Sequence, residues 1–290
     1  MNLNQFHQKV NDFYRTAKRA KRTVAEFFLA HPEEVAFMTL DDVSRRTGVS
    51  PATITRTATE IGFRGYPGLQ EEVRRSVRRS LAPTERLERA PVPEGSLGYP
   101  ESLAIDQRNL QALPTMNDAS TVEEAIALLS AAPHVYLFAS RTSYSAISFL
   151  GFLLAQIRPG VRLLTEDEGR WVEQLLDLEG DDLLMTMALP RYARIVVRAM
   201  EQGRARGCRV ISISDGPLSP LCRHSNLSLF VPYESYSFFN STVPAMALVN
   251  ALATGVNLRL GGRALRRLEE HDRMMDAQSL LLSPAAEEED

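Results

Sequence analysis

Apolar residues recur at helical spacing through the first 80 positions of the chain, and nothing there alternates as a half-buried strand would. Val24, Phe27 and Phe28 share one such face, and Val43 belongs to another. Glycine and proline interrupt the pattern at Gly48, Gly62, Gly65 and Pro67-Gly68. We therefore predict an all-α module of short helices over residues 1–81, ending in a charged helix over 71–81.

Beyond residue 101 the pattern changes to short apolar runs that alternate with helical stretches. Helices are predicted at 101–113, 121–131, 143–156, 168–178, 192–206 and 242–260. The runs between them are rich in β-branched and aromatic residues and predict buried strands at 135–138, 161–164, 183–187, 209–213 and 227–231. Strands that alternate with helices of this length form a parallel sheet covered on both faces. The expected fold is a three-layer α/β domain with a five-stranded parallel sheet.

A chain of 290 residues is long enough for two domains, each with its own core. Between the two patterns lie several breakers and few large apolar residues: Pro83, Pro91, Pro93, Gly95, Gly98 and Pro100. That composition predicts a linker over 82–100. The predicted boundaries are therefore 1–81 for the helical domain, 101–276 for the α/β domain and 277–290 for an acidic, solvated tail.

The net charge of −3 conceals an asymmetry between the two parts of the chain. Residues 1–80 hold 14 Lys and Arg against 9 Asp and Glu, whereas the remainder holds 19 against 27. A basic front module on an acidic remainder favours a polyanionic partner for the front module, such as DNA or RNA.

Several classes of protein are excluded by what the sequence lacks. The longest apolar stretch that stands out, 146–157, has 12 residues and contains Ser148, so it is shorter than the roughly 20 residues of a membrane span. The polar first ten residues do not resemble a secretory signal, and Cys208 and Cys222 are too few for a disulfide framework. We expect a cytoplasmic protein with no membrane association. The five histidines have no metal-binding spacing, so we predict no metal, no cofactor and no catalytic residue.

The most specific segment is residues 40–56, which reads as a helix-turn-helix. Gly48 suits the left-handed end of a first helix, Ser50 suits the cap of the next helix, and Pro51 suits its first turn. The second helix would then present small and polar side chains, Ala52, Thr53, Thr55 and Arg56, to base edges and phosphates. A helical hairpin in an ordinary bundle is the structural alternative.

This segment, with residues 61–69 (IGFRGYPGL), resembles the N-terminal domain of RpiR/MurR-type bacterial transcription regulators over about 75 residues. The resemblance implies that Ser50, Ala52, Thr53, Thr55 and Arg56 lie on a DNA-recognition helix. It also implies that Arg64, Gly65 and Tyr66 lie in the following loop, near the DNA backbone. Arg45 and Arg46 are candidate phosphate contacts, or else part of a solvated helix face.

In that family the second domain is a sugar isomerase (SIS) domain, which holds phosphorylated sugars with two strand-to-helix loops. Those loops usually read G-x-G-x-S and S-x-S-G-x-T. Here the first loop is Ala139-Ser140-Arg141-Thr142-Ser143, and the second is Ala188-Leu189-Pro190-Arg191-Tyr192-Ala193, so an arginine occurs in each loop where the family has glycine.

Because the arginine fork suits carboxylate or phosphate, we predict that these loops bind an anionic metabolite: an organic acid, a sugar acid or a sugar phosphate. The predicted effector-binding residues are Ser140, Arg141, Thr142, Ser143, Arg191, Tyr192 and Glu234. The structural alternative is that both arginines pair with acidic residues such as Glu166, Asp167 or Glu234.

The function that these observations favour is a DNA-binding transcription regulator, expected to be a repressor of a metabolic operon. Its predicted partners are a double-stranded DNA operator, a small anionic metabolite and further copies of itself in a homodimer or homotetramer. Two alternatives remain: a sugar-phosphate isomerase on the same fold, and a regulator whose SIS domain only oligomerises. An isomerase needs a general base and a ring-opening acid, and neither His134 nor His224 belongs to a recognisable catalytic group.

Overall fold

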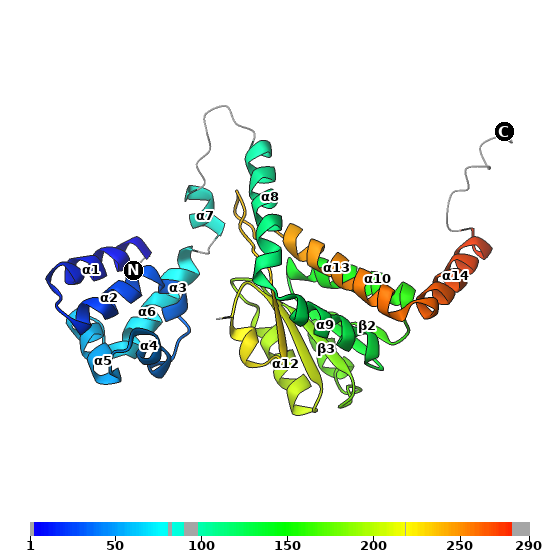
Figure 1. Ribbon diagram of the computed structural model, residues 1–290, viewed down its shortest axis with the longest axis horizontal. Coiled ribbons are helices and arrows are strands. Elements are labelled where there is room, and N and C mark those ends of the chain that lie inside the picture. Colours follow the sequence, from blue (N-terminus) through cyan, green and yellow to red (C-terminus); the bar gives the residue numbers. More distant parts are fainter. Residues whose placement is uncertain (1–2, 81–82, 90–97, 218, 280–290) are drawn as a thin grey trace. The chain divides into compact units, whose positions relative to one another are not determined.

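The computed structural model describes residues 3–80, 83–89, 98–217 and 219–279 (Figure 1). Its contacts divide the chain into two compact units. The first comprises Met1–Ile105, Leu218–Pro220 and Ser235–Asn240, and the second comprises Asp106–Pro217, Leu221–Glu234 and Ser241–Asp290. Of the predicted linker, residues 82 and 90–97 lie outside the described residues, as do residues 280–290 of the predicted acidic tail.

Within the described residues, the first unit is helical up to the linker, as the apolar pattern predicts. Its helices are α1 (Leu3–Thr16), α2 (Ala20–Ala30), α3 (Pro32–Val35), α4 (Leu40–Thr47), α5 (Pro51–Glu60), α6 (Gly65–Ser80) and α7 (Pro83–Arg89). Their apolar faces meet in one core, where Phe6, Phe28, Ile54 and Leu69 are fully buried. This core lets short helices, each marginal alone, form a stable module.

The second unit is a three-layer α/β fold around a five-stranded parallel sheet. The strands are β1 (Val135–Ala139), β2 (Val161–Leu163), β3 (Leu183–Met187), β4 (Arg209–Ser214) and β5 (Leu227–Phe230), in the order β2-β1-β3-β4-β5. All residues of β1 and β3 are buried, because helices cover both faces of the sheet. The predicted fold class is therefore confirmed.

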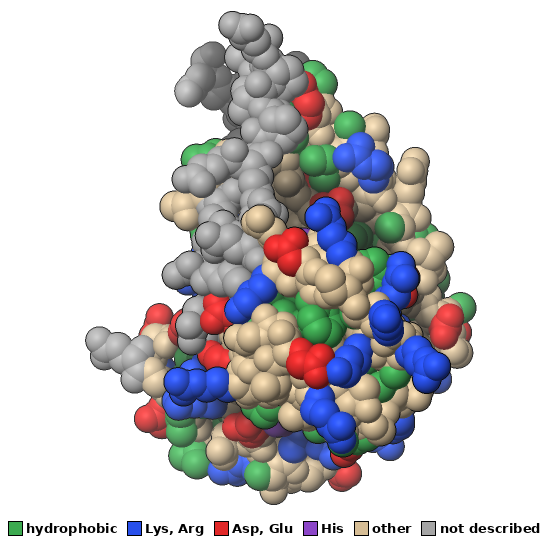
Figure 2. Space-filling model, turned by 90° about the vertical axis from the view of Figure 1, so that its left-hand side faces the viewer, with side chains coloured by type: hydrophobic (Ala, Val, Ile, Leu, Met, Phe, Trp, Pro, Cys, Tyr) green, Lys and Arg blue, Asp and Glu red, His purple; other side chains and the backbone are tan. Residues whose placement is uncertain are grey.

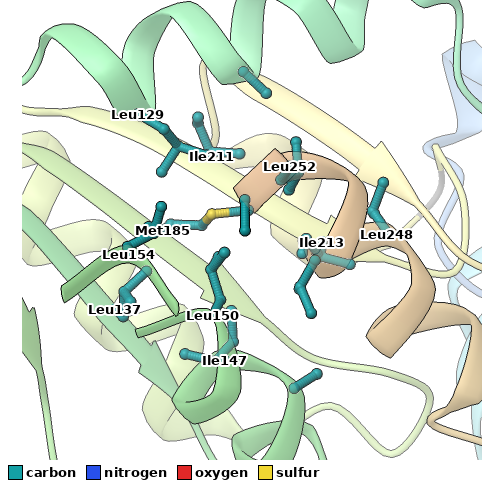
Figure 3. Packing of buried hydrophobic residues seen from close by; sticks show 14 of the residues in the cluster. Leu129, Leu137, Ile147, Leu150, Leu154, Met185, Ile211, Ile213, Leu248 and Leu252 are labelled. Atoms are coloured by element: carbon teal, nitrogen blue, oxygen red, sulfur yellow. The ribbon is translucent and has the colours of Figure 1, made fainter. Parts of the chain in front are cut away.

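Helices α9 (Ala119–Ala131), α10 (Ser143–Ile157) and α13 (Val243–Leu260) pack on one face of the sheet. There, leucines of α10 and α13, such as Leu150 and Leu252, meet Met185 and Ile211 of the strands (Figure 3). Helices α11 (Arg170–Gln174) and α12 (Arg194–Ala205) pack against the other face. Helix α8 (Tyr99–Met116) enters the second unit at Asp106, and Leu113 packs against its core. Helix α14 (Gly262–Ala277) also belongs to this unit, and its Ala264 is buried in the same core.

The structure differs from the predicted secondary structure at four places. Helix α6 begins at Gly65, six residues before the predicted start at residue 71, and it includes Pro67. Proline is tolerated in the first turn of a helix because backbone N–H groups there make no intrahelical hydrogen bond. The helix expected over 168–178 is reduced to a 3₁₀ turn at Asp167–Gly169 and the five residues of α11. Helix α7 lies inside the predicted linker, and α14 has no counterpart among the predicted helices.

Helix α13 is, among the described residues, long and apolar enough by composition to cross a membrane. A search for uninterrupted apolar runs misses it because Asn250 and Thr254 divide the helix. Its apolar side chains, including Leu248, Val249 and Leu252, are instead buried in the core of the α/β unit. This burial is typical of a core helix.

Candidate functional site

Helices α4 and α5 form the predicted helix-turn-helix, and both are held by capping side chains. Thr39 and Asp42 cap the start of α4 reciprocally, and the hydrogen bonds from Thr39 hold the pKa of the Asp42 carboxyl below its usual value. Gly48 ends α4 with a φ of +67°, a conformation that glycine adopts without steric cost. Ser50 then caps α5, and its Oγ accepts from the backbone N–H of Thr53 at 3.4 Å.

The outward face of α5 has the small and basic character expected of a recognition helix. Ala52 and Arg56 are exposed, and Thr53 and Thr55 are half-buried, while Ile54, Thr57 and Ala58 face the core. The turn of Gly48, Val49 and Ser50 is anchored from within, because the Ser44 hydroxyl donates to the Val49 carbonyl at 2.8 Å. This geometry leaves the first turns of α5 accessible to a duplex.

Arg45 and Arg46 are exposed, but each has an acidic neighbour. Arg45 pairs with Asp42, and Arg46 lies 3.5 Å from the Glu34 carboxylate. On the face that Figure 2 turns to the viewer, Lys and Arg side chains alternate with acidic ones. The basic surface is therefore interspersed with carboxylates, and these two arginines would have to leave or share their partners to contact phosphate.

The three predicted residues after α5 have different environments. Arg64 is exposed, and Gly65 has a φ of +67° at the start of α6. Tyr66, by contrast, is only 3% exposed, packs beside Phe28 and donates its hydroxyl hydrogen to the Met38 carbonyl at 2.9 Å. Burial raises the pKa of the Tyr66 phenol, as expected for a core group. Tyr66 therefore lies in the first turn of α6 and not in the predicted loop. Its side chain is enclosed by the packing of α6 on α3 and by Phe28 of α2, so its burial does not support a direct contact with DNA.

In the second unit, the two predicted ligand loops follow the neighbouring strands β1 and β3. The order in which the chain adds strands to the sheet reverses between these two strands. Ala139 at the end of β1 pairs with Met187 at the end of β3, so the loops 140–142 and 188–193 emerge side by side. The chain then continues into α10 on one face and into α12 on the other. In sheets of this strand order, the β1/β3 switch point is where ligands bind, because the diverging helices leave a crevice.

Arg141 and Arg191 share an unusual backbone conformation in these loops. Their φ angles are +58° and +73°, in the left-handed region that glycine favours. Both side chains are exposed, and neither forms an ion pair with Glu166, Asp167, Glu234 or any other carboxylate among the described residues. The alternative in which these arginines serve internal ion pairs therefore finds no support in the part of the chain that the structure covers.

The remaining predicted effector residues divide into three groups. Ser140 and Ser143 are each 5% exposed at the loop base, and Thr142 is exposed at the start of α10. Tyr192 is half-buried and donates its hydroxyl hydrogen to Asp215. Glu234 follows β5, which β4 separates from β3, and its carbonyl accepts from the Asn109 side chain. The structure thus brings the two loops together, whereas Glu234 follows β5, two strands away from β3.

Asp215 contacts the second of these loops through Tyr192, and it was not among the predicted site residues. It follows β4, beside the β3 loop, and burial raises the pKa of its carboxyl despite hydrogen bonds from Tyr192 and Ser214. Its position directly after an apolar strand was the available signal, because the carboxyl ends of parallel strands share one edge.

The histidines considered for an isomerase lie elsewhere. His134 precedes β1 and pairs with the buried Asp182 at 3.0 Å, and His224 precedes β5. Both therefore lie at the amino ends of strands, opposite the loops at the carboxyl ends. No group of three or more potential metal ligands occurs among the described residues.

Two sequence families match separate parts of the chain. Residues 4–80 match the helix-turn-helix domain of the rpiR family, and residues 128–255 match the SIS domain. The HTH-type transcriptional regulator HexR of Pseudomonas aeruginosa is 25% identical over 265 residues, which are 87% of this chain and 90% of that protein.

Solved structures show the same fold. The sugar isomerase domain of an RpiR transcription factor from Sphaerobacter thermophilus superposes with a TM-score of 0.58 at 26% identity, covering 60% of this chain and 98% of that one. The NanR protein of Vibrio vulnificus, complexed with ManNAc-6P, superposes with a TM-score of 0.65 at 18% identity, covering 96% of this chain and 100% of that one. With a helix-turn-helix unit followed by a SIS domain, the chain belongs to the RpiR family of transcription regulators.

Proposed function

We propose that this regulator represses a metabolic operon and that an anionic metabolite, bound at the β1/β3 switch point, controls its affinity for operator DNA. The observation that carries the effector site is the left-handed backbone of Arg141 and Arg191. Non-glycine residues avoid this conformation at a cost of about 1–2 kcal/mol, so two strained arginines in adjacent loops are a costly arrangement. Such strain concentrates at ligand-binding sites, where it sets a side chain in place for its ligand.

The chemistry of the crevice favours an anion. Arg141 and Arg191 provide planar, charged forks, and the helices that follow, α10 and α12, carry no acidic residue in their first turns. Each helix begins without a side-chain cap, so its positive end is available to a negative group. The ManNAc-6P complex of NanR adds support for a phosphorylated sugar, and the arginines also suit sugar acids and organic acids.

On the DNA side, α5 serves as the recognition helix, with Ala52, Thr53, Thr55 and Arg56 toward the major groove. Ser50 contributes by capping this helix, and Arg45, Arg46, Arg64 and the Gly65 backbone face the phosphates. A homodimer or homotetramer in the cytoplasm presents paired recognition helices to half-sites one helical turn apart. Effector binding then changes operator affinity by a coupling of roughly 1–3 kcal/mol.

The experiment begins with genomic selection of bound DNA, followed by fluorescence anisotropy on the selected operator over a salt series. Metabolites are then screened by thermal shift against organic acids, sugar acids and sugar phosphates. We expect the R141A/R191A variant to bind operator as the parent does but to lose its effector response. The control is R198A/R204A, which removes two exposed arginines of α12.

Three results would contradict the proposal. Recovery of no sequence-specific site would exclude the regulatory role on DNA. An unchanged effector response in R141A/R191A would exclude the switch-point site and favour an oligomerising SIS domain. Turnover of a sugar phosphate by the parent chain would favour the isomerase.

A further inference from the structure

A basic cavity lies at the opposite end of the sheet from the proposed effector loops. It measures about 840 Å³ and is walled by the residues before β1, by the turn between α10 and β2, and by α14. Its lining residues are Ser130, Ala131, Ala132, Pro133, Ile157, Arg158, Pro159, Leu260, Arg263, Arg266, Arg267, Glu269, Glu270 and Arg273. Because these segments adjoin the amino ends of β1 and β2, the cavity is separate from the crevice at the carboxyl ends.

Helix α14 supplies most of the charge of this cavity. Arg266, Arg267 and Arg273 follow Arg263 by three, four and ten residues. At this spacing the four side chains share one face of the helix. The first turn of α14 contains no acidic residue, so the positive end of the helix adds to these guanidinium charges. Within the described residues none of the four arginines forms an ion pair, although Glu269 and Glu270 line the same cavity.

Arg158 has a different role in the same wall. It is 6% exposed, and its guanidinium donates to the carbonyls of Leu129, Ala132, Pro133 and Pro159. These carbonyls lie at or after the end of α9 and at the α10–β2 turn, so Arg158 satisfies backbone groups that would otherwise be buried without donors. Arg158 therefore stabilises the wall of the cavity, while N–H groups of the α14 arginines are available to a ligand.

Two of the α14 arginines are positioned by a single backbone contact each. The Nε of Arg267 donates to the Ala155 carbonyl at 3.1 Å, and the Nε of Arg273 donates to the Glu269 carbonyl at 3.1 Å. Their terminal nitrogens have no hydrogen-bond acceptor among the described residues. Arg263 and Arg266 are exposed and likewise make no such bond there. The cavity thus contains four guanidinium groups whose terminal N–H groups can donate to a ligand.

We propose that this cavity is a second ligand site, which binds a small metabolite carrying at least two phosphoryl groups. Five arginines against two glutamates leave an excess of three positive charges. One phosphoryl group carries only about −1.5 to −2 at neutral pH, so two are needed to balance that excess. The volume lies within the usual range of small-molecule sites, roughly 300–1,000 Å³, and accommodates such a ligand. The bound anion ties α14 to the segments around β1 and β2.

The test uses calorimetry on the full chain with sodium pyrophosphate, and with inorganic phosphate at matched ionic strength. Pyrophosphate should bind at least about tenfold more tightly than phosphate and should raise the midpoint of thermal unfolding. The R263Q/R266Q variant should weaken pyrophosphate binding at least about tenfold, because hydrogen bonds to charged groups are lost. E269Q/E270Q, which removes two negative charges, should tighten it, and this variant keeps the test decisive if R263Q/R266Q does not fold.

Two controls separate this site from the proposed effector crevice and from non-specific attraction. R198Q/R204Q removes the same charge from exposed positions of α12 and should leave pyrophosphate affinity unchanged. R141A/R191A should also retain pyrophosphate binding. Unchanged binding in R263Q/R266Q would overturn the proposal, as would equal losses in R198Q/R204Q or a loss confined to R141A/R191A.

Discussion

The hydroxyl of Tyr192 donates to both carboxylate oxygens of Asp215, at 2.9 and 3.0 Å. This contact joins the loop after β3 to the end of β4 and gives a buried carboxyl one of its few donors. It anchors the loop 188–193, the second of the two proposed effector loops, while Arg191, one residue earlier, remains exposed.

Replacement of Tyr192 by phenylalanine should destabilise the chain by about 1–2 kcal/mol at neutral pH, because the Asp215 carboxylate loses a donor. Burial already raises the pKa of Asp215 above its usual 3.8, and loss of the Tyr192 bond raises it further. A folded state that binds a proton more tightly than the unfolded state loses stability as the pH rises through that folded pKa. The deficit of Y192F should therefore shrink toward acid pH.

Urea unfolding of Y192F and the parent at a series of pH values measures this deficit. Y144F is the matched control, since the Tyr144 hydroxyl makes no hydrogen bond among the described residues. A deficit that stays constant from neutral to acid pH would show that Asp215 titration plays no part.

Replacement of Arg141 or Arg191 by glycine should stabilise the fold by about 0.5–1 kcal/mol each, because relief of the left-handed strain exceeds the added chain entropy of the unfolded state. The effector response should be lost at the same time. Chemical denaturation measures the first effect and operator release measures the second. R198G should instead destabilise by about 1 kcal/mol, because Arg198 lies inside α12. Destabilisation by R141G and R191G would contradict a strained native loop.

Ser50 combines a structural role with a position near DNA, and two substitutions separate these. S50A should destabilise by about 1 kcal/mol through loss of the α5 cap. S50D should preserve stability, because aspartate caps as well as serine does, but should weaken operator binding by placing a negative charge near phosphate. Thermal unfolding and anisotropy titrations report the two effects. Undiminished DNA affinity of S50D would place Ser50 away from the duplex.

Substitutions of Tyr66 and Arg56 should have opposite effects: the first should lower stability and leave DNA affinity unchanged, and the second should do the reverse. Y66F removes the hydrogen bond to Met38 and should destabilise by about 0.5–1.5 kcal/mol, with the operator affinity of the folded protein unchanged. R56A should leave stability within about 0.5 kcal/mol because Arg56 is exposed. If Arg56 contacts a phosphate, R56A should also reduce the slope of log affinity against log salt by about 0.9. Loss of DNA affinity in well-folded Y66F would restore the DNA-contact hypothesis for Tyr66.

Some features of this protein could be predicted from the sequence because they depend on neighbouring residues. The strands β1 and β3 appear as unbroken apolar runs, since both faces of a covered sheet are buried. The turn between α4 and α5 follows from Gly48, Ser50 and Pro51, whose backbone preferences and capping groups act locally.

Other features depend on segments that are distant in sequence, and only the tertiary structure decided them. Tyr66 is polar at its tip and could face water or core. Packing of α6 on α3 and the ring of Phe28 buried it. The pairing of β1 with β3 brought the loop of Arg141 beside the loop of Arg191. Folding of α14 placed Arg263 in the same cavity wall as Arg158, more than 100 residues earlier. Local propensity determines which elements form, because it acts between neighbours; which side chains meet depends on how those elements pack.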